Sequence, residues 1–221
     1  MRLTIIYDND SARGDLRADW GFACLVEAHG RRILFDTGAR GDILLANMDR
    51  LGLDPAAVDT VFLSHAHWDH TGGLEAFRSR NTTAPVYAPE SWRETPSDRE
   101  VVRVRQPVEL GPGLRSTGEL GGVEQSLLVE IEGGLAVVVG CSHSGVGNIL
   151  RRAGEFGRPA ALIGGLHRFD DFDALAGLKL VCATHCTAHG GEIRRLYPGA
   201  WTEGGAGRVI ELEDRPASAG V

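Results

Sequence analysis

The sequence has neither a long apolar segment nor a secretory signal. Its apolar runs reach only five residues, as at Leu135–Val139, whereas a helix needs about 20 apolar residues to cross a bilayer. The N-terminal stretch MRLTIIYDND lacks the apolar core of a signal peptide, and acidic residues follow at once. We therefore expect a cytoplasmic protein without a membrane-bound part.

Lysine is almost absent, since Lys179 is the single lysine among 23 basic residues. Acidic residues number 30, the net charge is −7, and no run of Lys and Arg exceeds two. An acidic chain without a basic stripe is poorly suited to the phosphate backbone of a nucleic acid. The sequence thus predicts no nucleic-acid partner and leaves the oligomeric state open.

Cysteine is scarce, with four residues and no CxxC pair: Cys24, Cys141, Cys182 and Cys186. A chain of this length does not need disulfide bonds to stabilise its fold. Glycine is abundant instead, at 30 of 221 residues, and is dispersed at turns rather than gathered in a linker. Because no linker interrupts the chain, we expect one domain over residues 1–215. The last residues, 216–221, form a predicted frayed tail.

Strands and helices alternate along the chain. Apolar segments on either side of short glycine turns predict two hairpins, 21–29 with 31–36 and 125–132 with 135–140. Further strands are predicted at 3–8, 58–64, 85–88, 160–164, 178–183 and 208–212. Helices are predicted at 43–51, 74–80, 146–156, 171–176 and 192–197. Early hairpins followed by strand–helix units predict an α/β protein with sheets inside and helices outside.

The segment SHAHWDHTGG at 64–73 carries the strongest chemical signal. Three histidines and one aspartate fall within six residues, directly after an apolar strand. Imidazole and carboxylate groups are ligands for zinc, iron or manganese. Residues i and i+2 of an extended turn point the same way, so His65 and His67 can share one metal. Asp69 and His70 lie further along and can serve a second metal nearby.

Three more histidines each follow an apolar strand and a turn of small residues: His143, His167 and His185. If these strands end at one rim, the histidines converge on the 64–73 segment. Asp36, in FDTG, is another carboxylate at a strand end. We expect it to orient a ligating histidine by accepting its second ring N–H. His167 is our candidate for a substrate or leaving-group contact.

SHAHWDHTGG resembles the signature of the metallo-β-lactamase superfamily, and FDTG at 35–38 fits the same order of motifs. The resemblance implies a four-layer αββα sandwich over nearly the whole chain, with metals at the rim between the sheets. YDND, DWGF, ILFDTG, GCSHSG, IGGLH and HCT are together similar to one subgroup. That subgroup contains the dihydropterin–ribofuranosylaminobenzene phosphate synthases of methanopterin-type cofactor biosynthesis.

The resemblance also implies a set of metal ligands: His65, His67, Asp69, His70 and His185. The chain departs from the family at two points. The glycine-rich loop that usually holds a third histidine is GPGLRSTGELGG here, and the usual Gly-Asp after a strand is Gly140-Cys141. We expect His143 to supply the missing imidazole. Whether Cys141 ligates, bridges or only packs stays open.

A metal with an open coordination position lowers the pKa of bound water toward ~7 and makes hydroxide available. We therefore predict a metal-dependent hydrolase of a small phosphorylated or ester-like molecule, with one or two divalent ions. Zinc is expected, with manganese and iron as alternatives, and Asp69 would also position the nucleophile. Two alternatives stay open, namely a pterin-diphosphate-using transferase and a non-catalytic metal-binding or redox module.

Overall fold

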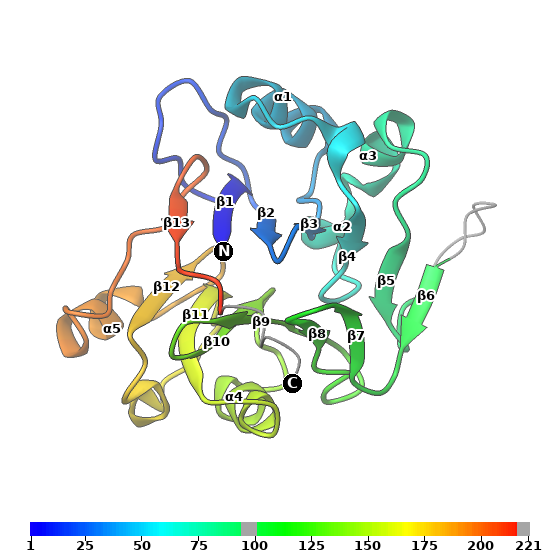
Figure 1. Ribbon diagram of the computed structural model, residues 1–221. Coiled ribbons are helices and arrows are strands. Elements are labelled where there is room, and N and C mark those ends of the chain that lie inside the picture. Colours follow the sequence, from blue (N-terminus) through cyan, green and yellow to red (C-terminus); the bar gives the residue numbers. More distant parts are fainter. Residues whose placement is uncertain (94–100, 216–221) are drawn as a thin grey trace.

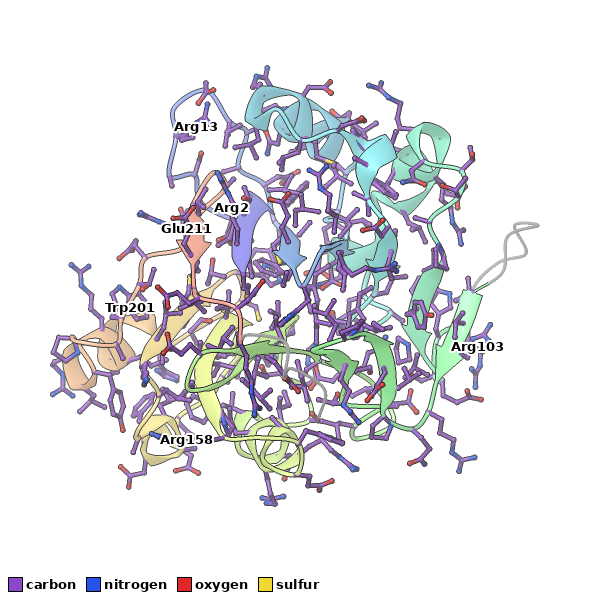
Figure 2. All side chains as sticks on the ribbon, viewed as in Figure 1. Arg2, Arg13, Arg103, Arg158, Trp201 and Glu211 are labelled. Carbon is purple, nitrogen blue, oxygen red and sulfur yellow. The ribbon has the colours of Figure 1, made fainter. Side chains whose placement is uncertain are left out.

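The computed structural model describes residues 1–93 and 101–215, so the predicted tail at 216–221 lies outside the described residues. Two β-sheets face each other, and helices cover the outer face of each sheet (Figure 1). This is the predicted four-layer αββα sandwich. Side chains fill the space between the two sheets (Figure 2).

The first sheet has the strand order β13-β1-β2-β3-β4-β5-β6. Neighbours from β13 to β3 pair antiparallel, and those from β3 to β6 pair parallel. The predicted first hairpin is confirmed as β2 and β3. Arg2 and Glu211, labelled in Figure 2, lie opposite each other on β1 and the edge strand β13. The strand bounds are β1 (Arg2–Tyr7), β2 (Ala23–Ala28), β3 (Arg31–Phe35), β4 (Thr60–Phe62), β5 (Val86–Pro89), β6 (Val101–Val104) and β13 (Val209–Glu211).

The second sheet has the order β12-β11-β10-β9-β8-β7. Its strands β10, β11 and β12 run parallel, while β7 to β10 pair antiparallel. The predicted second hairpin is confirmed as β9 and β10. The strand bounds are β7 (Val108–Gly111), β8 (Leu114–Ser116), β9 (Leu127–Ile131), β10 (Gly134–Val139), β11 (Pro159–Gly165) and β12 (Leu180–Thr184).

The helices in the described residues lie close to their predicted positions, with two additions, a 3₁₀ turn at 55–57 and a helical turn at 68–71. The first α-helix ends at Gly52, whose φ of 68° allows its N–H to turn back onto the carbonyls of Met48 and Asp49. The single-turn helix α2 was not predicted. The bounds are α1 (Gly41–Leu51), α2 (Trp68–Thr71), α3 (Leu74–Arg80), α4 (Val146–Gly154) and α5 (Gly190–Leu196), with 3₁₀ turns η1 (Pro55–Ala57) and η2 (Phe172–Leu175). Across residues 1–93 and 101–215, no helix is long and apolar enough to span a membrane.

Three apolar layers hold the sandwich together. The central layer lies between the sheets and includes Phe35 and Val129. An outer layer joins α1 and α3 to the first sheet through residues such as Phe77. The other outer layer joins α4 and α5 to the second sheet through residues such as Ile149. Strands with both faces buried are apolar throughout, which explains the run of apolar residues in β10.

Contacts among the residues that follow five of the strands show that these strands end at one rim of the sandwich: β3, β4, β10, β11 and β12. Four non-glycine residues in the loops that follow these strands have a positive φ, between 47° and 59°: Asp36, Ser142, His167 and His185. This left-handed conformation costs a non-glycine residue about 1–2 kcal/mol. Such residues cluster at functional sites, where the surrounding structure holds them in place.

Candidate metal centre

The HxHxDH segment leaves β4 and turns at once into α2. The turn exposes Trp68, which is 65% accessible, and buries Asp69 and His70. A β-carbon at Gly72 would lie 2.1 Å from the carbonyl oxygen of Ala39, and one at Gly73 would lie as close to that of Thr37. The two glycines therefore let the backbones of α2 and the loop after β3 pack in direct contact.

Three imidazoles meet at the open side of the rim, and we call them the histidine group: His65, His67 and His143. His65 Nε2 lies 3.1 Å from His67 Nδ1. The ring of His143 is 4.9 Å from that of His65 and 4.7 Å from that of His67, measured between centroids. One nitrogen from each ring lies within 4.8 Å of the others, so the three can ligate one ion.

A second set lies deeper, and we call it the mixed group: Asp69, His70 and His185. The Nε2 atoms of His70 and His185 are 3.2 Å apart. Asp69 Oδ2 lies 3.3 Å from His185 Nε2 and 3.8 Å from His70 Nε2. Because the rings of His65 and His70 are only 4.2 Å apart, the two groups are neighbours. Residues predicted as ligands from three separate segments thus lie together.

The hydrogen bonds behind the mixed group show that it fits a cation. His70 Nδ1 lies 2.7 Å from Asp36 Oδ2, and His185 Nδ1 lies 3.0 Å from Asn9 Oδ1. We assign the Nδ1 proton of each ring to these oxygens, which leaves a lone pair on each Nε2. Two lone pairs facing each other at 3.2 Å repel unless a positive ion binds both.

Asp36 orients both groups from behind. Its fully buried carboxylate accepts the Ser64 N–H at 2.7 Å, the Ser64 hydroxyl at 2.7 Å and His70 Nδ1–H. The Ser64 oxygen in turn lies 2.8 Å from His65 Nδ1 and accepts its proton. Burial raises the pKa of Asp36, and the two hydrogen bonds from Ser64 oppose that shift. Asp36 therefore fixes His70 directly and His65 through Ser64.

The electrostatics favour neutral imidazoles and an ionised aspartate. Burial lowers the pKa values of His65, His70 and His143, and the charges of neighbouring imidazoles lower them further. Burial raises the pKa of Asp69, but the neighbouring imidazoles of His185, 3.3 Å away, and of His70 outweigh it, so that pKa falls below its usual range. Neutral imidazole and ionised carboxylate are the forms that bind metals.

His167 lies beside the centre but belongs to none of the ligand groups found within the described residues. Its ring centroid is 5.0 Å from that of His143, and the side chain is exposed. A cavity of about 460 Å³ adjoins the histidine group, and its wall includes Ser91, Val123 and Ser144. The position of His167 is compatible with its predicted contact to a substrate, which stays a prediction.

Several supporting residues escaped the sequence analysis. Trp20 donates its indole N–H to Asp69 Oδ2 at 2.9 Å. Asp8 is buried and accepts the backbone N–H of His185 at 3.0 Å, which anchors the loop after β12. Asp8 and Trp20 lie in YDND and DWGF, motifs that the resemblance singled out without giving them a role. Cys141 Sγ lies 3.2 Å from both His70 Nε2 and Cys186 Sγ.

Sequence comparisons agree with this geometry. The family model described as the metallo-beta-lactamase superfamily matches residues 21–152. The chain is 27% identical over 233 positions to 7,8-dihydropterin-6-methyl-4-(beta-D-ribofuranosyl)-aminobenzene-5'-phosphate synthase of Methanocaldococcus jannaschii, covering 75% of this chain and 79% of that protein. It is 42% identical over 76 residues to a ribonuclease of Thermus thermophilus, covering 34% of this chain and 18% of that one.

Solved structures give the same answer. A metal-dependent hydrolase of the beta-lactamase superfamily superposes with a TM-score of 0.79 at 26% identity, covering 97% of this chain and all of the other. A diphosphatase of the PhnP family shares the fold, with a TM-score of 0.63, 16% identity, and coverage of 96% and 98%. The family model matches more than half of the sequence, and the chain therefore belongs to the metallo-beta-lactamase superfamily.

Proposed function

We propose that this chain is a metal-dependent hydrolase of a small phosphorylated or ester-like molecule. The observation that carries the proposal is the pair of adjacent ligand groups, three imidazoles beside Asp69, His70 and His185, at a rim that opens into a cavity. The similarity to a solved metal-dependent hydrolase, which the chain covers completely, supports it.

Divalent ions bound by these groups would act as Lewis acids and activate water for attack. Zinc suits this set of nitrogen and oxygen donors, with manganese and iron as alternatives. Asp69 is held ionised, so its carboxylate can accept a hydrogen bond from a water molecule and orient it. His167 stands exposed beside His143, where its imidazole can contact a substrate or protonate a leaving group.

The test is a purified chain loaded in turn with zinc, manganese and iron(II), assayed on a panel of phosphodiesters, phosphomonoesters and carboxylic esters. We expect turnover of at least one class, lost in His67→Ala. His189→Ala is the matched control, because this histidine lies at the start of α5 beside Glu192 and belongs to neither ligand group. A chain that holds metal but hydrolyses nothing on the panel would favour the non-catalytic alternative.

A second function is favoured by one comparison, the 27% identity over most of the chain to a synthase named for a dihydropterin and an aminobenzene ribose phosphate. Trp20, 50% exposed and 5.3 Å from the ring of His185, offers a flat surface beside the mixed group on which a heterocycle can stack. Phosphorus NMR separates the two functions. A transferase releases pyrophosphate from a pterin diphosphate only when an aromatic amine acceptor is present, and a hydrolase does not need the acceptor.

A further inference from the structure

Two cysteines distant in the sequence meet at the rim. Cys141 follows β10 and Cys186 follows β12, and their sulfur atoms are 3.2 Å apart. Both are free thiols. Cys141 is 3% exposed and Cys186 is partly exposed, whereas Cys24 and Cys182 are fully buried. A partly exposed cysteine therefore lies in contact with a buried one.

Glycine between these strands makes the contact possible. Gly165 ends β11, which lies between β10 and β12 in the sheet. A β-carbon at Gly165 would lie 2.8 Å from Cys186 Sγ and 2.4 Å from the carbonyl oxygen of Gly140. Any larger residue would occupy the space through which the two sulfurs reach each other across the end of β11.

We propose that Cys141 and Cys186 form a reversible disulfide on exposure to a hydroperoxide, and that this disulfide weakens metal binding at the adjacent centre. The metal-related half of the proposal rests on the proposed function. The cross-link itself rests on the contact between the sulfurs and on the difference in their exposure.

The oxidation proceeds in two balanced steps. The sulfur of Cys186, the more exposed of the two residues, attacks a peroxide oxygen; an S–O bond forms, the O–O bond breaks, one water leaves, and a sulfenic acid remains. The Cys141 sulfur then attacks the Cys186 sulfur; the S–S bond forms, the S–O bond breaks, and a second water leaves. Together the two thiols lose two electrons and two protons, and one hydrogen peroxide becomes two waters. A dithiol reductant reverses the reaction.

The link to the metal centre follows from shared neighbours. Cys141 forms a possible ligand set with His65 and His70, and both sulfurs form another with His185. Thiolate is the form of cysteine that ligates metals. Once the sulfurs bond to each other, neither can supply a negative charge to the ions, and only imidazoles and Asp69 remain to hold them. Bound metal should in turn slow the oxidation.

The experiment treats the full chain, metal-free and zinc-loaded, with hydrogen peroxide, alkylates the remaining thiols and digests with trypsin. Cys141 lies in the peptide 116–151 and Cys186 in the peptide 180–194, with fragmentation separating Cys186 from Cys182. We expect a cross-linked pair two hydrogens lighter than the separate peptides, reversed by dithiothreitol. We also expect zinc affinity to fall at least tenfold, measured with a chromogenic chelator. Cys186→Ser should neither cross-link nor lose zinc under peroxide.

Two results would overturn the proposal. One is oxidation of Cys186 to a sulfinic acid, or no oxidation at all, without a cross-link in the metal-free chain. The other is a cross-linked chain that binds zinc as tightly as the reduced chain. If the reduced chain binds no metal, the proposed function fails, while the cross-link is still measured on its own.

Discussion

Replacement of Asp36 by asparagine tests how the metal centre is oriented. Asp36 accepts three hydrogen bonds at a fully buried position, two from Ser64 and one from His70. Asparagine has nearly the same shape but offers an N–H₂ group in place of one acceptor oxygen. If that group faces His70, the histidine proton moves to Nε2, the atom that must bind the metal. Losing such an orienting partner costs about tenfold to a hundredfold in metal affinity, or about 1.4–2.8 kcal/mol.

The assay is a competition titration of zinc against a chromogenic chelator. Asp59→Asn serves as the control. Asp59 accepts the backbone N–H of Arg32, in β3, at 2.7 Å and directly precedes β4, but it is exposed and lies away from the rim. Urea unfolding of the metal-free chain separates weaker binding from a damaged fold. A folded Asp36→Asn chain with the zinc affinity of the unchanged protein would refute the role given to Asp36.

Three further outcomes are expected. Native mass spectrometry should show His67→Ala without the ion of the histidine group, and turnover should be lost with it; retention of both ions would place His67 outside the ligands. His167→Ala should keep its metal content and lose turnover, whereas a lost metal equivalent would make His167 a ligand. The metal-free chain should become less stable to urea between pH 7.5 and 5.5. Burial lowers the pKa values of His65 and His70. Below pH ~6.5 the unfolded chain therefore binds more protons than the folded chain, and the free energy of unfolding falls by up to about 1.4 kcal/mol per pH unit for each histidine. The raised pKa of Asp36 opposes this loss of stability, because the folded chain can bind one additional proton there. A rise in stability toward pH 5.5 would contradict the prediction that the two buried histidines are neutral in the folded chain.

Much of the fold was predictable because its signals are local. Both hairpins turn at glycines between apolar runs, and α1 ends at a glycine with positive φ. Strands β6, β7 and β8 are harder to predict from the sequence, because they are only three or four residues long and β6 and β7 are only partly buried. The turn α2 contains four residues, too few for a helical period, and backbone hydrogen bonds from Phe22 and Thr37 to Asp69 and His70 help to hold it.

The site was predictable where its residues are dense in the sequence or follow apolar strands. The motif at 64–73 meets both conditions, and the histidines after β10 and β12 meet the second. Asn9, Trp20 and Cys186 were missed because their contacts depend on how the two sheets and their loops face each other. The contact between Cys141 and Cys186 requires the strand order β12-β11-β10, which no pattern within either segment specifies.

Two metal ions at the rim are the core of the proposed function, and anomalous diffraction locates them most directly. Crystals of the chain, purified without added metal and then loaded with zinc, should be measured on both sides of the zinc absorption edge. We predict one peak among the nitrogens of His65, His67 and His143 and a second among Asp69, His70 and His185. Peaks elsewhere on the chain, or none at the rim after loading, would contradict the proposed metal centre.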